Sequence, residues 1–328
     1  MRIYVTRLIS DKSLALVRQF AGQQSALLDV WPEDRPIPRD ALLEKVRGVD
    51  GLLCLLTERI DTELMDAAGE SLKVISQMAV GYDNIDVAAA SARRIPIGNT
   101  PGVLTDTTAD LAFALLMAAA RRLGEGERYV RTRQWQTWSP NLMLGTEVTG
   151  ATLGLVGFGR IGQAVARRAR AFEMRVLTAS RTRRPELESA LGVEYTDFDS
   201  LLAQSDFVSI HVPLNPETRH LFGETQFKRM KPDAILINTA RGPVVDQAAL
   251  YRALKSGAIA YAALDVTDPE PIPPDDPLLA LDNVIIVPHV GSATVQTRGK
   301  MATMAAENLI AGLKGERLPN CVNEAVYA

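Results

Sequence analysis

Short apolar runs alternate with amphipathic segments through the first hundred residues of the chain. The apolar runs are rich in Val, Ile and Leu, and the strands that they predict are residues 2–5, 26–30, 51–55 and 72–75. The amphipathic segments predict helices at 39–46 and 61–68, the second with Asp61 as its N-cap. Strands that alternate with helices in this way form parallel sheets with helices on both faces. We therefore predict a small α/β domain in this part of the chain.

The same alternation begins again near residue 150. The strands predicted there are residues 152–156, 175–179, 207–212, 234–238, 260–264 and 284–287. Two longer helices, residues 105–122 and 296–313, lie on either side of this region, and the first is apolar nearly all round, so we expect it to be buried. Because 328 residues exceed the usual size of a single core, the fold class predicted is α/β with two domains and parallel sheets.

A glycine-rich turn joins the strand at 152–156 to a helical segment. It reads Gly157-Phe158-Gly159-Arg160-Ile161-Gly162, which is the pattern G-x-G-x-x-G. In dinucleotide-binding folds the first glycine permits a sharp turn, the second lets a pyrophosphate approach the backbone, and the third lets the helix pack on the sheet. The helix N-terminus offers N–H groups and a positive dipole end to the phosphates. The strand–turn–helix–strand context therefore predicts a dinucleotide site.

The end of the second strand of this unit indicates which dinucleotide. An Asp or Glu is expected there in NAD-binding proteins, because it binds the ribose hydroxyls. This chain instead continues Ser180-Arg181-Thr182-Arg183-Arg184, with no carboxylate. A hydroxyl followed by guanidinium groups suits a 2′-phosphate, so we predict that NADP(H) is preferred and that NAD(H) is possible. The alternative is a solvated basic loop.

The bulk composition narrows the class of partner. The formal net charge is −3 and the calculated pI is about 5.8, which does not favour nucleic acid or an anionic membrane. Cys54 and Cys321 have no metal-ligand spacing, and Cys54 lies in an apolar run typical of a buried thiol. No signal-peptide pattern and no run long enough to span a bilayer is present. We expect a cytoplasmic protein without a metal or a disulfide framework.

Polar residues gather at the predicted strand ends, where ligands bind in parallel sheets. In the first domain, the exposed N–H groups of Val80 and Gly81 are candidates for holding a small carboxylate. The alternative is an ordinary strand-to-helix turn in which Asp83 or Asn84 caps the next helix.

Three residues of the second domain are candidates for catalysis: Arg241, Glu270 and His289. Reduction of a 2-oxo acid needs a cation for the carboxylate and carbonyl and a proton donor near neutral pH, which Arg and His provide. A carboxylate beside a histidine favours its charged form and fixes the orientation of its ring. Structural salt bridges and caps are the alternative for all three residues, because separation in sequence says nothing about contact in space.

The segment that contains Trp135 and Trp138 has no clear periodicity. Aromatics of this kind often close an active site or form a subunit contact, and a small satellite core explains them equally well.

Six segments of the chain match one known family. They are VGYDNID (80–86), NTPGVLTDTTADLA (99–112), LGLVGFGRIGQA (153–164), INTARGPVVD (237–246), ALDVTDPEP (263–271) and PHVGSAT (288–294). Over essentially its whole length the sequence resembles the D-isomer-specific 2-hydroxyacid dehydrogenases, and the branch that it resembles is the glyoxylate/hydroxypyruvate reductases. The catalytic triad of that family falls on Arg241, Glu270 and His289.

The resemblance implies a fold and a set of site residues. Two Rossmann-like domains (flavodoxin-like plus dinucleotide-binding) are expected, with residues 100–289 as the dinucleotide-binding domain inserted into a substrate-binding domain of residues 1–99 and 290–328. The substrate-binding residues implied are Val80, Gly81 and Arg241. The cofactor-binding residues implied are Thr108, Gly157, Gly159, Arg160, Ile161, Gly162, Ser180, Arg181, Val212, Pro213, Thr218, Thr239, Ala240, Asp265 and Gly291.

The activity implied is NADPH-preferring reduction of glyoxylate or hydroxypyruvate by a homodimer. An alternative within the family is a 2-ketogluconate or other 2-ketoaldonate reductase, because those enzymes share segments like 220–227 and 321–323. An alternative from another class is an NAD(H)-sensing corepressor-like interaction protein, which the absence of long polar extensions disfavours.

Overall fold

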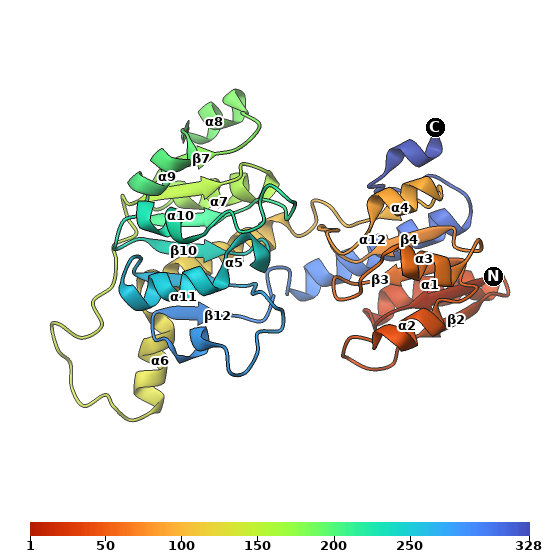
Figure 1. Ribbon diagram of the computed structural model, residues 1–328, viewed down its shortest axis with the longest axis horizontal. Coiled ribbons are helices and arrows are strands. Elements are labelled where there is room, and N and C mark those ends of the chain that lie inside the picture. Colours follow the sequence, from red (N-terminus) through yellow and green to blue (C-terminus); the bar gives the residue numbers. More distant parts are fainter. The chain divides into compact units, whose positions relative to one another are not determined.

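The computed structural model describes residues 1–328 and divides into two compact units. The first unit contains residues 1–104 and 292–328, and the second contains residues 105–291 (Figure 1). The predicted crossings, after residues 99 and 289, lie a few residues before the observed ones. Both units contain a fully parallel sheet, which confirms the predicted α/β class.

The first unit has a five-stranded sheet in the order β2-β1-β3-β4-β5. Its strands are β1 (Arg2–Val5), β2 (Leu27–Val30), β3 (Gly51–Cys54), β4 (Val74–Gln77) and β5 (Ile97–Gly98). Its helices are α1 (Asp11–Gln23), α2 (Arg39–Lys45), α3 (Thr62–Ala68), α4 (Val87–Ala92) and α12 (Val295–Leu313). Side chains of α1 and α12 pack on one face of the sheet, and those of α2, α3 and α4 pack on the other. The helix nearest the end of the chain therefore completes the core of the first unit.

Two helix N-termini in this unit test the predicted caps. Asp61 is the N-cap of α3, and its carboxylate accepts a hydrogen bond from the N–H of Leu64, as predicted. The N-cap of α4 is Asp86, which accepts from Ala89, and not Asp83 or Asn84. The alternative in which Asp83 or Asn84 caps this helix is therefore wrong, and the Asn84 side chain donates instead to backbone carbonyl oxygens of the loop after β3.

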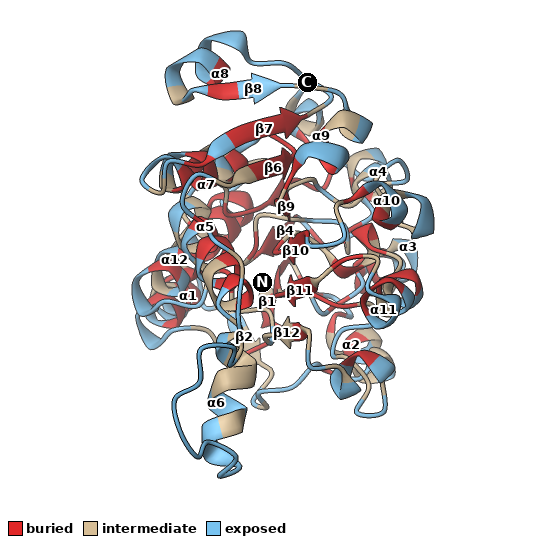
Figure 2. Ribbon diagram, turned by 90° about the vertical axis from the view of Figure 1, so that its left-hand side faces the viewer, coloured by how far each residue is buried: buried red, intermediate tan, exposed pale blue.

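The second unit has a seven-stranded sheet in the order β12-β11-β10-β9-β6-β7-β8. Its strands are β6 (Thr152–Val156), β7 (Arg175–Ala179), β8 (Val193–Tyr195), β9 (Phe207–Ile210), β10 (Ile235–Asn238), β11 (Tyr261–Leu264) and β12 (Val284–Ile286). Its helices include α5 (Thr105–Ala120), α7 (Arg160–Arg170), α8 (Pro185–Leu191), α9 (Phe198–Gln204), α10 (Glu224–Arg229) and α11 (Gln247–Ser256). Side chains of α5 and α7 cover one face, and those of α9, α10 and α11 cover the other. The central strands are therefore buried, whereas the edge strands β8 and β12 are only partly buried (Figure 2).

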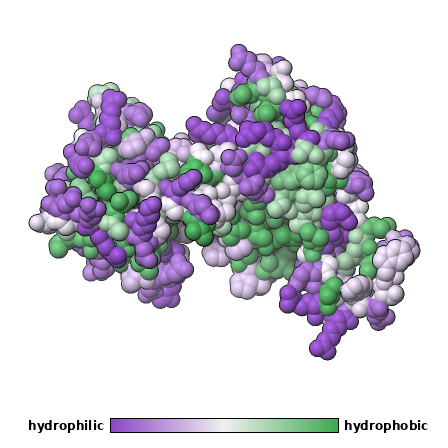
Figure 3. All heavy atoms as spheres, turned by 180° about the vertical axis from the view of Figure 1, so that it is seen from behind, coloured by the Kyte–Doolittle hydropathy of each residue, from purple (hydrophilic) through white to green (hydrophobic).

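An arm of residues 121–145, including α6 (Leu123–Arg131), extends from the second unit. Its two ends meet where the N–H of Thr146 donates to the carbonyl oxygen of Ala120, at 2.8 Å. A Cβ on Gly145 would lie 2.1 Å from that oxygen, so the closure requires glycine. No residue of α6 is buried, and Trp138 is 78% exposed. Hydrophobic residues spread over one face of the second unit and onto this arm (Figure 3).

Candidate active site

The three glycines of the turn after β6 differ in what surrounds them. Gly157 has a φ of 99°, and a Cβ on it would lie 2.7 Å from the carbonyl oxygen of His211. A Cβ on Gly162 would lie 2.4 Å from the carbonyl oxygen of Gly157, so the first turn of α7 packs on the end of β6. At Gly159 nothing lies within 4 Å of the Cβ position. Gly157 and Gly162 thus permit close packing, whereas Gly159 leaves the backbone open to a ligand.

The surroundings of this turn fit a dinucleotide. The turn follows β6, which neighbours β9 where the strand order reverses, and ligands bind at such positions in open α/β sheets. The N-cap of α7 is Gly159, which provides no side-chain cap, so N–H groups of the first turn remain for an anion. After β10, the hydroxyl of Thr239 is buried without a hydrogen-bond partner. The uncapped N-terminus of α7, the unobstructed backbone at Gly159 and the unpaired hydroxyl of Thr239 together suit a phosphate-containing ligand.

The arginines after β7 have different partners. Arg181 is exposed, and its Nη1 lies 3.1 Å from a carboxylate oxygen of Glu217. The guanidinium of Arg183 stacks 4.4 Å above the centre of the Tyr195 ring and pairs with Glu188 at 2.8 Å. The hydroxyl of Ser180 donates to the carbonyl oxygen of Thr182. Arg183 therefore stabilises the loop, whereas Arg181 extends from it beside a single exposed carboxylate.

His289 and Glu270 are brought into direct contact. Glu270 lies in the loop after β11 and His289 in the segment after β12, and these strands are neighbours in the sheet. The Nδ1 atom of His289 lies 2.5 Å from the Oε1 atom of Glu270, and both side chains are partly exposed. The contact fixes the ring orientation and makes Nε2 the nitrogen that faces away from the carboxylate.

Asp265 holds the backbone on which His289 is carried. Its carboxylate accepts from the N–H groups of Val290, at 2.6 Å, and Gly291, at 2.8 Å, and its carbonyl oxygen accepts from the N–H of His289. The side chain is 1% exposed, and this burial raises the pKa of the Asp265 carboxyl above its usual range. The residue therefore ties the end of β11 to residues 289–291.

Arg241 follows β10 on a loop that is packed against the loop carrying Glu270. The Asn238 side chain donates to the carbonyl oxygen of Arg241 at 2.9 Å, and the Arg241 Nη1 donates to the carbonyl oxygen of Ala240. A Cβ on Gly242 would lie 1.8 Å from the carbonyl oxygen of Thr267, so the two loops touch through their backbones. Arg241 and Glu270 therefore come from adjoining loops at one edge of the sheet.

The other residues predicted to bind cofactor also lie in the second unit. Val212 and Pro213 follow β9, and the Thr218 hydroxyl donates to the carbonyl oxygen of Pro213 at 2.6 Å, which closes that loop. Thr108 lies buried in the first turn of α5, and its hydroxyl is 3.6 Å from the Cβ position of Gly291. The predicted residues thus occupy the carboxyl edge of the sheet and the starts of α5 and α7.

Val80 and Gly81 belong to the first unit, where they follow the carboxyl end of β4. Both are partly exposed. The carbonyl oxygen of Val80 accepts from the side-chain amide of Asn99 at 2.9 Å, and that of Gly81 accepts from the amide of Gln77 at 2.5 Å. Asn99 and Gln77 were not singled out in the sequence as site residues. Asn99 directly follows β5 at the same edge, but that strand is too short to be predicted from the sequence.

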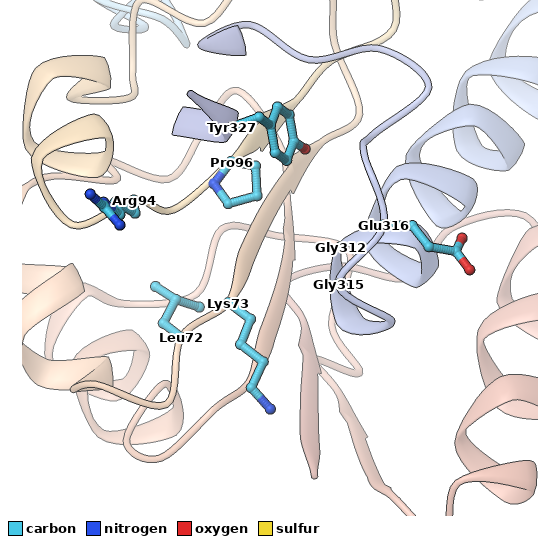
Figure 4. A pocket seen from close by; sticks show the side chains of 8 residues that line it. All are labelled: Leu72, Lys73, Arg94, Pro96, Gly312, Gly315, Glu316 and Tyr327. Carbon is cyan, nitrogen blue, oxygen red and sulfur yellow. The ribbon is translucent and has the colours of Figure 1, made fainter. Parts of the chain in front are cut away.

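A pocket of about 330 Å³ lies at the opposite edge of the first unit's sheet, beside the start of β4. Its charged residues, Lys73, Arg94 and Glu316, direct their side chains away from one another (Figure 4). No common point exists at which they would hold a ligand. This pocket therefore adds no candidate ligand site.

The structure contains neither a cluster of metal ligands nor a helix suited to span a membrane. No group of three or more His, Cys, Asp or Glu side chains is arranged to hold a metal ion. None of the helices combines the length and the apolar character needed to cross a bilayer.

Comparison with known proteins gives a consistent result. The family model for the NAD binding domain of D-isomer specific 2-hydroxyacid dehydrogenases matches residues 113–291. Over 326 residues the chain is 54% identical to a glyoxylate reductase of Korarchaeum cryptofilum, covering 99% of this chain and 96% of that protein. A crystal structure of a protein from Thermus thermophilus is 48% identical with a TM-score of 0.91, covering 98% of this chain and 100% of that one. A glyoxylate reductase from Paecilomyes thermophila is 34% identical with a TM-score of 0.87, covering 99% of each chain.

The parallel sheet, the glycine turn and the contact between His289 and Glu270 define a Rossmann-type oxidoreductase. The chain belongs to the D-isomer specific 2-hydroxyacid dehydrogenase family, and it is an NAD(P)-dependent enzyme of that family. The family and the enzyme class predicted from the sequence are both confirmed.

Proposed function

We propose that the protein reduces a small 2-oxo acid, glyoxylate foremost and hydroxypyruvate as well, to the 2-hydroxy acid with NADPH as the preferred reductant. The observation that carries this proposal is the pair formed by His289 and Glu270 at the sheet edge that also contains the glycine turn. Glyoxylate is chosen because relatives that match almost the whole chain are named glyoxylate reductases.

The residues of the second unit have distinct roles in this proposal. The turn of residues 157–162 and the buried hydroxyl of Thr239 hold the dinucleotide, whose nicotinamide supplies the hydride when bound. Arg241 binds the substrate carboxylate and polarises the carbonyl with its guanidinium. His289 delivers a proton from Nε2 to the carbonyl oxygen, and Glu270 at Nδ1 stabilises the charged ring before the transfer. We assign the second unit as the dinucleotide-binding domain.

The first unit is proposed as the substrate-binding domain. The N–H groups of Val80 and Gly81 donate to the substrate carboxylate from the carboxyl end of β4. The preference for NADPH is proposed from Arg181, because its exposed guanidinium is placed at the end of β7, where a 2′-phosphate is bound in this fold.

A homodimer is proposed from the exposed apolar side chains of the arm, which are Leu123, Val130, Trp135, Trp138, Leu142 and Leu144. A monomer with this exposed surface would carry a large hydrophobic patch without a partner. Sedimentation should give a species of about twice the chain mass of 35.7 kDa, and a W135S/W138S double variant should sediment as a monomer. A wild-type monomer at micromolar concentration would contradict the proposal.

The central experiment is a set of initial rates for glyoxylate, hydroxypyruvate and 2-ketogluconate, each with NADPH and with NADH. We expect the highest kcat/KM for glyoxylate with NADPH. Faster turnover of 2-ketogluconate would show that it, and not glyoxylate, is the preferred substrate. Equal rates with NADPH and NADH would show that the enzyme has no cofactor preference. No turnover of any 2-oxo acid would contradict the function itself.

A further inference from the structure

The two peptide groups that carry the N–H groups of Val80 and Gly81 are each held at the carbonyl side. The carbonyl oxygen of Ala79, in the peptide that contains the Val80 N–H, accepts from the N–H of Thr100 at 2.8 Å. The carbonyl oxygen of Val80, in the peptide that contains the Gly81 N–H, accepts from the Asn99 amide at 2.9 Å. One dipeptide, Asn99-Thr100, therefore bonds to both peptide groups. Neither N–H donates to an acceptor within the protein.

These hydrogen bonds determine where the N–H groups point and how strongly they donate. A peptide group is planar, so fixing its carbonyl oxygen also fixes the direction of its N–H. A carbonyl that accepts a hydrogen bond is polarised, and this strengthens donation from the N–H of the same peptide. Asn99 and Thr100 thus prepare two donors at the carboxyl end of β4.

Asn99 is itself fixed by residues near the end of the chain. It is 8% exposed, and its carbonyl oxygen accepts from the side-chain amide of Asn308 on α12, at 2.9 Å. The Oδ1 atom of Asn308 accepts from the N–H of Asn320, whose carbonyl oxygen accepts from the N–H of Asn99. A Cβ on Gly98 would lie 2.7 Å from the Asn308 Cβ, so glycine is needed for this close approach.

The next peptide group is held from the other side of the loop. The Gln77 amide donates to the carbonyl oxygen of Gly81 and also exchanges hydrogen bonds with the side chain of Asn84, at 2.9 and 2.8 Å. Asn84 in turn donates to the carbonyl oxygens of Leu55 and Glu58. Three consecutive carbonyl oxygens, of residues 79–81, are therefore bonded by groups outside the loop, which is more than a simple turn requires.

We propose that Asn99 is a positioning residue for the substrate carboxylate, acting through the peptide group between Val80 and Gly81. It does not touch the substrate. It orients and polarises the Gly81 N–H, and so sets the affinity for 2-oxo acids without affecting the dinucleotide. This inference rests on the proposed function, since it assigns the ligand of these N–H groups as a carboxylate.

Asn323 provides a matched control within the same unit. Its side chain accepts from the N–H of Ile97 at 2.8 Å and donates to the carbonyl oxygen of Ile95, at the opposite end of β5. It is 8% exposed, as Asn99 is. Its side chain also donates to the Ser91 hydroxyl, so Asn323→Ala removes more hydrogen bonds than Asn99→Ala and should lower Tm at least as much. Only Asn99→Ala should change substrate affinity.

The experiment compares both alanine variants with Asn99→Asp in the full-length enzyme. For Asn99→Ala we expect KM for glyoxylate to rise about tenfold, with kcat within about threefold and the Kd for NADPH unchanged. The binding of oxamate, a 2-oxo acid analogue that is not reduced, should weaken by the same factor. Asn99→Asp should raise KM about 100-fold at neutral pH, because its carboxylate has no proton to donate and repels the substrate.

The Asp variant adds a readout that a purely structural role would not produce. As the pH falls toward the range in which its carboxyl is protonated, the O–H can donate to Val80, so the ratio of its KM to the wild-type KM should fall. A KM within twofold of wild type for Asn99→Ala would overturn the proposal, as would an equal rise in KM for Asn323→Ala. A wild-type enzyme that reduces no 2-oxo acid would instead overturn the proposed function, and with it the ligand assigned to these N–H groups.

Discussion

The two sheets of this protein have the same kind of edge but present different chemistry there. At the carboxyl edge of the second unit, side chains of Arg241, Glu270 and His289 follow three neighbouring strands. At the carboxyl edge of the first unit, the exposed donors are backbone N–H groups, and the side chains of Gln77, Asn84 and Asn99 are used to hold that backbone. One edge therefore offers charged and ionisable side chains, and the other offers neutral backbone donors.

Under the proposed function, this difference divides the work between the two edges: backbone donors of the first unit recognise the substrate carboxylate, and proton transfer takes place at the second. A backbone N–H recognises a carboxylate with fixed geometry and little loss of entropy, but it does not act as an acid or a base. A histidine beside a carboxylate does act as an acid, although its side chain must be oriented. Substitutions of His289, Arg241, His211 and Arg181 test this difference, and we expect their effects to decrease in that order.

His289→Asn should have the largest effect, because it removes the proposed proton donor. We expect kcat to fall by about 10²–10⁴-fold, while the Kd for NADPH changes less than about twofold. Steady-state rates and fluorescence titration with NADPH measure the two quantities. A kcat within tenfold of wild type would show that the chemistry does not belong to this edge.

Arg241→Met should impair both binding and rate, because the guanidinium is proposed to act before and during the reaction. A loss of one or two charge-assisted hydrogen bonds predicts a fall in kcat/KM of about 100-fold, shared between a higher KM and a lower kcat. Arg241→Lys should recover the charge but not the planar fork, and so only part of the activity. An unchanged KM for glyoxylate would remove the assigned role.

His211 follows β9 at the same edge, but its environment keeps it neutral. Although part of its surface is exposed, surrounding protein atoms desolvate the ring and lower its pKa to about 4. Because the folded-state pKa lies below the unfolded value, its full contribution to stability is present above about pH 6.5 and is lost as the pH falls toward 4. We expect a loss of about 1–3 kcal/mol over this range, the lower figure allowing for the exposed part of the ring.

Urea denaturation of the wild type and of His211→Gln between pH 7 and pH 4.5 measures this loss. The free energy of unfolding should fall less steeply with decreasing pH in the variant. Parallel curves for the two proteins would show that the His211 ring binds protons equally in the folded and unfolded states. The lowered pKa of His211 would then be contradicted.

Arg181→Ala should have a smaller effect that is specific to one cofactor. We expect KM for NADPH to rise about tenfold and KM for NADH to stay within about twofold, because the guanidinium is exposed and partly screened. Glu217→Gln should lower KM for NADPH about threefold, since its carboxylate competes with a 2′-phosphate for Arg181. Glu224→Gln, which removes another exposed carboxylate, is the control and should change neither value. Equal losses for both cofactors in Arg181→Ala would contradict the 2′-phosphate assignment.

Most of the regular structure was predictable from hydrophobic patterning. The strands Arg2–Val5, Thr152–Val156 and Arg175–Ala179 were predicted to the residue, because each is a buried run with polar residues at its ends. The two-residue strand β5 was not predicted, since Ile97–Gly98 is too short to show a pattern. Helix α6 was also missed, because Gly124 and Gly126 lower its intrinsic helix propensity.

The sequence singled out the residues that we propose to react more clearly than the residues that support them. His289 and Glu270 stood out as residue types suited to proton transfer, and the structure shows their contact. Asn99, Asn308 and Asp265 act through backbone groups that are distant in sequence, so residue type alone did not reveal their partners. A hydrogen bond from a side chain to a distant backbone group has no characteristic spacing in the sequence. Only the folded structure shows which side chain and which backbone group lie together.

The contact between Asn308 and Asn99 also has a consequence for the order of folding during synthesis. Domains generally fold as units while the chain emerges, with the N-terminal one first. Here residues 105–291 are complete before α12 has been made, and α12 supplies both core side chains of the first sheet and the anchor of Asn99. Translation therefore completes the residues of the second unit while the first still lacks a helix. We expect the first unit, although its strands are translated first, to complete its fold last.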